Sequence, residues 1–406
     1  MDQALSANTL RFKSDQFKYH GEIDDSKSIV NRLLIVQSHY KNLKLNYASE
    51  AEDVLYLQQA LRDLEQGLYE FDLGSGGTTF RFFLARLSRQ PGRYIVRAHS
   101  KLLARPQRDL YQALEHLGTL VTFIPNGLSI NSLGWKETPS VKVKSDLSSQ
   151  FASSILANCW NLDHPFTIDL GKTVASRSFL DLTQNVCQRL GMKIDVDGTC
   201  LKIEANQRVK VKKLEAEVDA SSLFTLSCFA LLFGDLKIKP CSNRFGQPDF
   251  QFLDFFKDWG ISYKLDSKGF SISKQELPKF VEVNLKDCPD LFPVLAAFLS
   301  FCPGMHKLHG APHLVIKESN RIAKTQELLT AAGVQATPLA DGMIIEGQED
   351  LVPKNFSFNP ANDHRMAFAA AIFGFAGSQV DLEDRIVVKK SFPQFWDILG
   401  LENDGD

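Results

Sequence analysis

Cysteine is sparse in this sequence. It contains seven cysteines in 406 residues, an odd number, and no two of them form a C-x-x-C pair. A disulfide framework needs paired cysteines in a small secreted chain, and a cysteine-based zinc site needs closely spaced pairs. We therefore expect neither kind of site, and we expect reduced thiols in a cytoplasmic protein.

Long apolar runs and an excess of charge of one sign are also missing. The longest apolar candidates, such as 291–301, are shorter than the roughly 18 residues of a membrane span. The first twenty residues are polar and mixed in charge, so we expect no signal peptide. The 46 Lys and Arg nearly balance the 48 Asp and Glu, for a net charge of −2. This balance argues against a nucleic-acid or membrane partner.

The remaining composition is that of an ordinary folded protein. Hydrophobic residues make up 44% of the chain and charged residues 23%, which excludes a disordered, collagen-like or coiled-coil protein. At about 150 residues per domain, the length predicts two domains.

One pattern recurs six times along the chain: a short polar or glycine-rich cluster opens directly into an apolar, helix-like run. Ser, Thr, Asp, Asn and Gly are the residues that cap helix N-termini. The runs are apolar on nearly every face, so the helices should be buried. The six openings are Ser26-Lys27-Ser28, 74–79, Ser148-Ser149-Gln150, 219–222, 287–290 and 362–365.

Strand-like segments and further helices lie between these openings. Predicted strands are 93–97, 120–124, 194–196, 201–203, 270–272 and 343–345, and Asp-Gly pairs at 197–198 and 341–342 indicate hairpins. Predicted second helices, 179–190, 252–259 and 321–332, are each followed by Gly, the preferred C-terminal residue. Each repeat is thus predicted to be helix, strand, helix, strand, strand, and six repeats fit two domains.

Basic residues lie beside several of the openings. A helix N-terminus carries free N–H groups and a partial positive charge, which favours anions. Lys or Arg near a buried helix is costly unless its charge is compensated. The sequence therefore predicts a pocket for an anionic ligand with more than one charged group. The basic residues concerned are Lys27, Arg32, Arg81, Lys317, Arg321, Arg365 and Lys390.

Seven motifs in fixed order resemble the 5-enolpyruvylshikimate-3-phosphate (EPSP) synthase family. They are SKSIVNR, GSGGTTFR, SSQ, the Pro289-Asp290 pair, KESNR, NDHRMA and KKSFP, and the resemblance runs from about residue 20 to about 395. SSQ alone carries little information, whereas the ordered set is specific.

The resemblance implies an α/β fold of two domains in an inverse α/β-barrel-like arrangement, with three folding units in each domain. It implies that residues 1–20 and 217–406 form one domain with both termini, that 21–216 form the other, and that the active site lies in the cleft between them. The charged stretch 210–217 is a plausible crossing point.

The implied activity is transfer of the enolpyruvyl group of phosphoenolpyruvate to the 5-hydroxyl of shikimate 3-phosphate, with release of phosphate. This is a step of the shikimate pathway to chorismate and the aromatic amino acids, and such enzymes are glyphosate targets. No metal and no organic cofactor are implied. The partners are the two small-molecule substrates, and we expect a monomer.

The resemblance also carries residue roles. Catalysis is expected from Asp290, Glu318 and Lys27, with Asp290 as the base for the 5-hydroxyl. Shikimate 3-phosphate is expected on Lys27, Ser28, Arg32, Ser148, Ser149, Gln150, Ser176, Asp290 and Lys317. Phosphoenolpyruvate is expected on Lys27, Gly77, Lys101, Gln150, Arg321, Arg365 and Lys390. Asp290 is alternatively a helix N-cap.

Several positions depart from the family pattern: Ser75, Lys101, Phe179, Asn320 and His313. Lys101 stands where members of the family normally have an Arg that clamps phosphoenolpyruvate. Lysine keeps the charge and loses the bidentate fork, so we expect weaker binding of this substrate.

Other readings stay open. One is an enolpyruvyl transferase that acts on UDP-N-acetylglucosamine, although the loop 99–108 lacks the Cys that many such enzymes carry. Another is a degenerate, non-catalytic paralogue that binds phosphorylated metabolites. A metal site on His306, His309 and His313 has poor spacing, because Gly310 and Pro312 intervene, so we favour a strand and turn there.

Overall fold

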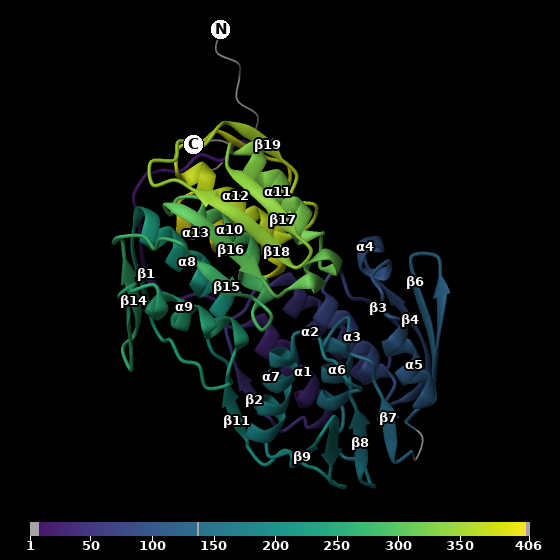
Figure 1. Cartoon of the computed structure of the whole chain (residues 1–406). Coiled ribbons are helices and arrows are strands. Elements are labelled where there is room, and N and C mark those ends of the chain that lie inside the picture. The colour runs from purple at the N-terminus through teal and green to yellow at the C-terminus, as the bar shows by residue number, and fades with distance from the viewer. Residues whose placement is uncertain (1–7, 136–137, 403–406) are drawn as a thin grey trace. The chain divides into compact units, whose positions relative to one another are not determined.

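The computed structural model describes residues 8–135 and 138–402 and divides the chain into two compact units (Figure 1). Unit 1 contains residues 1–24, 218–243 and 248–406, and unit 2 contains 25–217 and 244–247. Residues 1–7 of the expected first segment lie outside the described residues. The expected domain bounds, 1–20 with 217–406 and 21–216, stay a prediction.

The long segment of unit 2, residues 25–217, leaves and re-enters the chain of unit 1 at two neighbouring places, and residues 244–247 cross into unit 2 a second time. The N–H of Ser26 donates to the carbonyl of Glu217 at 2.8 Å, within unit 2. The N–H of Asp219 donates to the carbonyl of Asp24 at 3.1 Å, within unit 1. The two ends of the segment 25–217 therefore lie side by side, and this segment is inserted in the chain of unit 1.

Each unit contains two four-stranded sheets built in the same way. In each sheet the first two strands pair in parallel and the others pair antiparallel. In unit 2 the spatial orders are β3 (Glu70–Asp72), β4 (Pro91–Arg97), β6 (Gly127–Leu133), β5 (Thr119–Ile124), and β7 (Ser140–Lys142), β8 (Phe166–Asp169), β10 (Cys200–Ile203), β9 (Ile194–Asp197). In unit 1 they are β1 (Phe17–Gly21), β12 (Gly234–Ile238), β14 (Gly269–Ser273), β13 (Lys264–Asp266), and β15 (Glu282–Asn284), β16 (Gly304–His309), β18 (Gly342–Gly347), β17 (Gln335–Leu339).

The third repeat of each unit is shorter. It has one parallel pair of strands and no hairpin: β11 (Lys213–Glu215) with β2 (Lys44–Asn46), and β19 (Phe356–Phe358) with β20 (Val380–Leu382). The prediction of two closing strands in every repeat is therefore wrong for these two. The three-residue parallel strands were missed throughout, because three residues are too few to show an alternating pattern.

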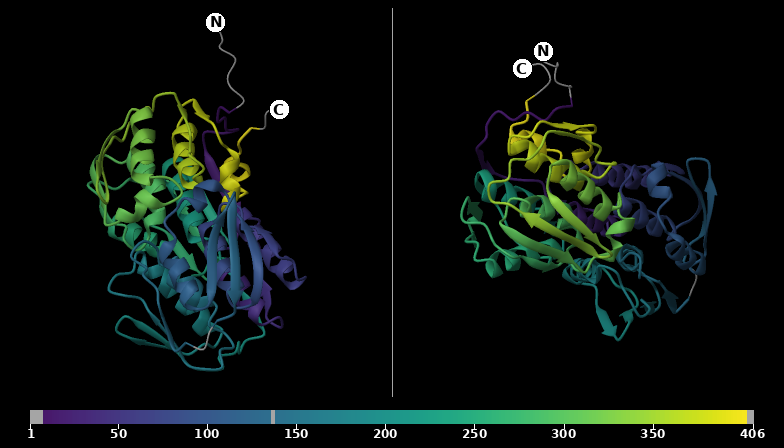
Figure 2. Two further views of the ribbon diagram at one scale, coloured as in Figure 1. Left: turned by 90° about the vertical axis from the view of Figure 1, so that its right-hand side faces the viewer. Right: turned by 45° about the horizontal axis from the view of Figure 1, so that its top comes forward.

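The six predicted helices behind the polar openings are confirmed. They are α1 (Lys27–His39), α3 (Gly77–Leu87), α6 (Gln150–Ala157), α8 (Ala220–Phe233), α10 (Phe292–Leu299) and α12 (His364–Phe375). Every residue of α10 and α12 is buried, as expected for runs that are apolar on all faces. Within each unit these helices lie inside, and the sheets cover them with one face exposed (Figures 1 and 2).

A second set of helices packs around them: α2 (Glu52–Glu65), α5 (Arg108–His116), α7 (Arg177–Arg189), α9 (Phe252–Asp258), α11 (Arg321–Ala331) and α13 (Phe395–Leu399). The predicted terminators Gly191, Gly260 and Gly333 have φ of 102°, 73° and 89°. This left-handed conformation favours glycine. A short helix, α4 (Ser100–Leu103), and four 3₁₀ segments, η1 (Pro248–Gln251), η2 (Pro289–Leu291), η3 (Pro312–Ile316) and η4 (Ile386–Lys390), complete the described elements.

The capping prediction holds for two of the six openings. Asp219 accepts a hydrogen bond from the N–H of Ser222, and Asp363 accepts one from the N–H of Arg365. The N-cap residues of α1, α3, α6 and α10 make no side-chain cap in the described structure. At α6 the N–H of Gln150 donates to Ser148 Oγ at 3.3 Å instead.

In the part of the chain that the structure describes, no helix combines the length and the hydropathy that a membrane span requires.

Phe229 anchors the core of unit 1, and its removal provides a test of the packing. Its ring lies within 6.2 Å of the rings of Phe17, Phe233, Phe375 and Phe395. We expect Phe229→Ala to lower the free energy of unfolding by about 3–5 kcal/mol, as for other buried aromatic truncations. Urea denaturation followed by circular dichroism measures this. Leu133→Ala, at a side chain 70% exposed, is the control, and an equal loss in both variants would contradict the assignment.

Candidate active site

A buried network of charges in unit 1 joins η2, the segment after η3, and the starts of α11 and α12. We call it the arginine–carboxylate cluster; its members are Asp290, Lys317, Glu318, Arg321, Asp363 and Arg365. All but Asp363 are residues predicted from the sequence. The folding of unit 1 brings them together from three motifs: the Pro289-Asp290 pair, KESNR and NDHRMA.

Arg321 is the centre of this cluster. Its side chain is 1% exposed and binds three carboxylates: Asp290 at 2.7 Å, and Glu318 and Asp363 each at 2.8 Å. Burial alone would lower the pKa of Arg321, but Asp363, Glu318 and Asp290 raise it. The guanidinium is therefore permanently charged, and the three carboxylates occupy its N–H donors.

Asp290 connects the two arginines. One oxygen accepts from Arg321, and the other accepts from Arg365 at 3.0 Å. Lys317 Nζ lies 3.5 Å from the carboxylate. Burial would raise the pKa of Asp290, but Arg365, Lys317 and Arg321 together hold it well below its usual value. Asp290 lies in η2 and makes no N-terminal cap for α10, so its alternative role as a cap is not observed.

Lys390 lies in η4 and is buried, and its Nζ donates to the carbonyl of Asn362 at 2.8 Å. Ala361 and Asn362 both have positive φ, 56° and 66°. This turn aims a backbone carbonyl at the lysine just before α12 begins. Lys390 and Arg365 are thereby linked through one short loop.

In unit 2, Lys27 opens α1 and donates to Asp53 Oδ2 at 2.8 Å. Asp53 is on α2, buried, and its Oδ1 would lie 2.4 Å from a Cβ built on Gly76. A side chain at position 76 would collide with this carboxylate. Glycine here allows the start of α3 to approach Asp53 closely.

A second group of unit 2 surrounds Gly77. A Cβ at Gly77 would lie 3.1 Å from Arg81 Nη1, 3.2 Å from Arg105 Nη1 and 3.3 Å from Gln150 Oε1. Arg81 also binds Gln150 directly and donates to Gln107 at 3.1 Å. Two guanidinium groups thus converge on the uncapped start of α3, which is a favourable place for an anion.

Arg32 is buried and has no carboxylate ion pair among the described residues. Its nitrogens donate to the carbonyls of Ser28 and Phe179 and to the hydroxyl of Thr183, at 2.7–3.0 Å. Burial lowers the pKa of Arg32 to about 10. The charge is solvated by neutral oxygens and lies over the Phe82 ring, 5.2 Å from its centroid, so a nearby anion would stabilise it further.

The serines predicted for substrate lie at two helix starts. Ser148 and Ser149 precede α6, and Ser149 is buried. Ser176 precedes α7 in the left-handed conformation, with φ of 47°. This conformation is uncommon for a residue other than glycine and costs about 1–3 kcal/mol. Strain of this kind is found where a side chain has to be held in one direction.

Known proteins with similar sequences match most of this chain. The profile of the EPSP synthase (3-phosphoshikimate 1-carboxyvinyltransferase) family matches residues 34–399. A 3-phosphoshikimate 1-carboxyvinyltransferase from Archaeoglobus fulgidus is 30% identical over 334 residues, which cover 81% of this chain and 78% of that protein.

The chain belongs to the EPSP synthase family.

Another 3-phosphoshikimate 1-carboxyvinyltransferase, from Pyrococcus abyssi, is 28% identical over 83% of this chain and 80% of its own length. Among solved structures, an EPSP synthase from Acinetobacter baumannii superimposes with a TM-score of 0.77 at 19% identity, over 97% of this chain and 99% of its own. The enolpyruvyl transferase NikO from Streptomyces tendae gives 0.72 at 13%, over 97% of each chain. The fold is therefore the two-domain inverse α/β-barrel-like fold of enolpyruvyl transferases, with three repeats in each unit, as predicted.

The positions that depart from the EPSP synthase family pattern have varied surroundings. Lys101 is exposed on α4, whereas Arg105, one turn later, is half-buried beside Gly77. Asn320 caps α11 by accepting from the N–H of Ala323 at 3.1 Å. His313 is partly buried, and burial followed by Lys317 lowers its pKa to about 4. Nothing in the structure explains Ser75.

Three residues near the predicted site were missed: Asp53, Arg105 and Asp363. Arg105 lies in the same loop as Lys101, and Asp363 lies inside NDHRMA, so the sequence marks both segments. Asp53 stands in a segment without a motif. Only the fold brings Asp53 to Lys27, and no sequence pattern would have shown this.

His306, His309 and His313, for which the sequence favours a strand and turn over a metal site, lie in β16 and η3. His306 is buried; its Nε2 lies 2.8 Å from the carbonyl of Cys302, and its Nδ1 accepts from the N–H of Val281. His309 lies 3.4 Å from Glu282. Both ring nitrogens of His306 are therefore occupied by backbone. No group of three metal-ligating side chains is present in the described ranges.

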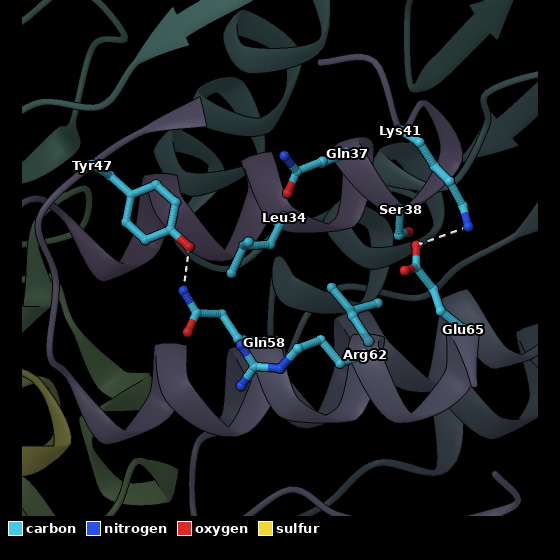
Figure 3. A pocket seen from close by; sticks show the side chains of 9 residues that line it. Leu34, Gln37, Ser38, Lys41, Tyr47, Gln58, Arg62 and Glu65 are labelled. Atoms are coloured by element: carbon cyan, nitrogen blue, oxygen red, sulfur yellow. Dashed lines mark hydrogen bonds and ion pairs between the residues drawn. The ribbon is translucent and has the colours of Figure 1, made fainter. Parts of the chain in front are cut away.

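A cavity of about 330 Å³ lies between α1 and α2 in unit 2 (Figure 3). Gln58 and Tyr47 hydrogen-bond at one end, and Lys41 pairs with Glu65 at 3.4 Å at the other. None of its lining residues is a predicted substrate residue. We assign no function to this cavity.

Removing the central guanidinium tests the charge balance of the cluster. Arg321→Gln leaves three carboxylates without their shared partner, so we expect the free energy of unfolding to fall by about 3–5 kcal/mol at pH 7. Asp290 has a lowered pKa in the folded protein, so its stabilising contribution is complete above the ordinary value of about 4 and is lost as the pH falls through the lowered value.

The decrease in the free energy of unfolding caused by Arg321→Gln should therefore become smaller below pH 4. Urea denaturation at pH 7 and at pH 3.5 measures it, with Arg177→Gln, on the exposed pair with Asp181, as the control. A loss that is independent of pH would show that packing, not charge, makes Arg321 important.

Proposed function

We propose that this protein is a 3-phosphoshikimate 1-carboxyvinyltransferase. It transfers the enolpyruvyl group of phosphoenolpyruvate to the 5-hydroxyl of shikimate 3-phosphate and releases phosphate, by addition and elimination through a tetrahedral intermediate. It thereby serves the shikimate pathway to chorismate. Family membership supports this proposal, and the observation that carries it is the pair of carboxylates, Asp290 and Glu318, held on one buried arginine.

The chemistry requires such a pair. Addition needs a base at the attacking hydroxyl and an acid that protonates the methylene carbon, and elimination reverses these demands. We assign the hydroxyl proton to Asp290, and we assign proton transfer at the methylene carbon to Glu318 and Lys27. Fixed cations would also hold the two anionic substrates together and lower the entropic barrier.

Asp290 is a weak base in the unliganded protein, because its pKa is well below the usual value. A phosphate or carboxylate that binds Arg365 competes with Asp290 for the same N–H groups. Once the substrate takes them, the carboxylate loses its strongest partners and its pKa rises toward the ordinary value. Substrate binding thus turns a structural ion pair into a functional base.

We propose the following substrate contacts. Shikimate 3-phosphate binds Lys27, Ser28, Arg32, Ser148, Ser149, Gln150, Ser176, Asp290 and Lys317. Phosphoenolpyruvate binds Lys27, Gly77, Lys101, Gln150, Arg321, Arg365 and Lys390. To the second set we add Arg105, because its guanidinium lies beside Gly77 and Gln150. Glyphosate competes with phosphoenolpyruvate for that set.

We propose a cytoplasmic monomer that needs no cofactor. All seven cysteines are free thiols, and five of them are buried. This agrees with a reducing compartment.

Phosphate release from phosphoenolpyruvate and shikimate 3-phosphate tests the function, with UDP-N-acetylglucosamine as the control acceptor. We expect phosphate release when shikimate 3-phosphate is the acceptor, and none when UDP-N-acetylglucosamine is the acceptor. Asp290→Asn removes the base, so we expect kcat to fall by about 10²–10⁴-fold, whereas the exposed Asp258→Asn should retain full activity. Release with the sugar nucleotide instead would identify the other transferase, and release with neither acceptor would indicate a non-catalytic paralogue.

Arg105 and Lys101 make a matched pair for the phosphoenolpyruvate pocket. A hydrogen bond to a charged group contributes about 1.5–3 kcal/mol, so we expect Arg105→Gln to raise the KM for phosphoenolpyruvate by about 10- to 100-fold. Arg105→Lys should recover part of this, because it keeps the charge and loses the fork. Lys101→Gln should change KM less. If Lys101→Gln has the larger effect, the assignment from the sequence stands and the one from the geometry is wrong.

A further inference from the structure

Arg81 is a buried arginine to which the chemistry above gives no role. It lies on α3 beside Gly77 and is 6% exposed. Its Nε donates to Gln107 Oε1 at 3.1 Å, and its Nη1 donates to Gln150 Oε1. The guanidinium therefore joins two neutral side-chain amides that come from different parts of unit 2.

Arg81 sets the orientation of both amides. A guanidinium has five N–H donors and no acceptor, so a neighbouring amide must turn its oxygen toward it and its nitrogen away. In Gln150 the nitrogen Nε2 donates to the hydroxyl of Thr78 at 3.1 Å. In Gln107 the nitrogen Nε2 donates to the carbonyl of Leu102 at 3.0 Å.

The guanidinium is itself held in place by an aromatic ring. Its central carbon lies 5.3 Å from the centroid of the Phe151 ring, and Phe151 is buried next to Gln150 on α6. Contact with an aromatic face, together with two directed hydrogen bonds, leaves the planar fork little freedom. A lysine at position 81 would keep the charge, but its ammonium has no fork to hold both amide oxygens.

Each amide serves a different part of the proposed substrate contacts. Gln150 is proposed for both substrates, and with its oxygen held by Arg81 it has its nitrogen left to donate. Gln107 is 2% exposed and precedes α5. The Leu102 carbonyl that it binds also accepts from the N–H of Arg105 at 3.2 Å. Gln107 thereby fastens the turn that ends in Arg105, which is proposed for phosphoenolpyruvate alone.

We propose that Arg81 is a positioning residue, which holds the Gln150 amide with its nitrogen available to the substrates and, through Gln107, fixes the turn that presents Arg105. This inference rests on the proposed contacts of Gln150 and Arg105 with the substrates. Arg81 itself binds neither substrate. Loss of its fork weakens substrate binding by two separable routes, one through each amide.

Arg81→Lys tests the role of the fork, because it keeps the positive charge. We expect KM to rise about 3- to 10-fold for both substrates, the range for one lost hydrogen bond. Arg86→Lys is the matched control, because Arg86 lies on the same helix, is buried and donates to Ser38 Oγ at 2.8 Å. Its two KM values should stay within about twofold of the wild type. Equal rises in the two variants overturn the proposal.

Gln107→Met separates the two routes, because it removes the link to Leu102 and changes no charge. We expect the KM for phosphoenolpyruvate to rise about 3- to 10-fold and the KM for shikimate 3-phosphate to stay unchanged. This variant also provides the test if Arg81→Lys fails to fold. An unchanged KM for phosphoenolpyruvate overturns the proposal, and so does an equal rise for both substrates.

A double-mutant cycle distinguishes action through Gln150 from direct binding of the ligand by Arg81. Shikimate 3-phosphate is the substrate to use, because only Gln150 connects it to Arg81 in the proposal. We expect that adding Arg81→Lys to Gln150→Ala raises this KM no further. A further rise as large as that in Arg81→Lys alone shows direct binding and overturns the proposal.

Nuclear magnetic resonance of the unliganded protein gives a test without turnover. With isotope-labelled nitrogen in the glutamine side chains, the amide signals of Gln107 and Gln150 are identified by their loss in Gln107→Met and Gln150→Ala. We expect both signals to shift in Arg81→Lys and neither to shift in Arg86→Lys. Unchanged signals in Arg81→Lys overturn the proposal.

The same spectra distinguish failure of the inference from failure of the proposed function. If neither acceptor supports turnover and both amide signals shift, the proposed function fails and the orientation of the two amides by Arg81 stands. Dissociation constants of the two substrates, measured by calorimetry, then replace the KM values in the comparisons above.

Discussion

Compensation of one buried charge organises unit 1. Arg321 is desolvated, and three carboxylates from three different elements offset that cost. The starts of α11 and α12 and the segment η2 are held together by this guanidinium. These carboxylates occupy the N–H groups that an anionic substrate would bind. A ligand must therefore compete with the protein's own carboxylates, so contacts that stabilise the fold oppose binding.

Unit 2 uses a different solution for its cations. Arg32 is surrounded by carbonyl and hydroxyl oxygens, and Arg81 and Arg105 gather at Gly77 around an amide. Among the described residues, Arg32 has no carboxylate ion pair, whereas Asp53 already holds Lys27. An anion at Arg32 would therefore displace no carboxylate, whereas an anion at Arg365 in unit 1 would compete with Asp290.

Much of this was visible in the sequence. Runs such as 223–233 are apolar on every face and therefore predict the buried inner helices. Glycines at 191, 260 and 333 correctly predict helix ends. The three-residue parallel strands left no pattern, since their identity depends on a partner far along the chain. The same reason hid Asp53, which acts through a neighbour that only the fold supplies. Lys101 lies in the loop that the resemblance indicates and stays a prediction, while Arg105, four residues later, is the residue that the fold brings beside Gly77.

The double passage of the chain has a consequence for how this architecture can be taken apart. Because Ser26 and Glu217 are joined by a backbone hydrogen bond, the ends of unit 2 are adjacent, and a short peptide could link them into a ring or a permuted chain. Asp24 and Asp219 are joined in the same way, so unit 1 could be closed over the gap. The segment 244–247 limits such a dissection, because it lies in the chain of unit 1 and yet holds the Glu217 carboxylate of unit 2 through Arg244, Phe245 and Gln247.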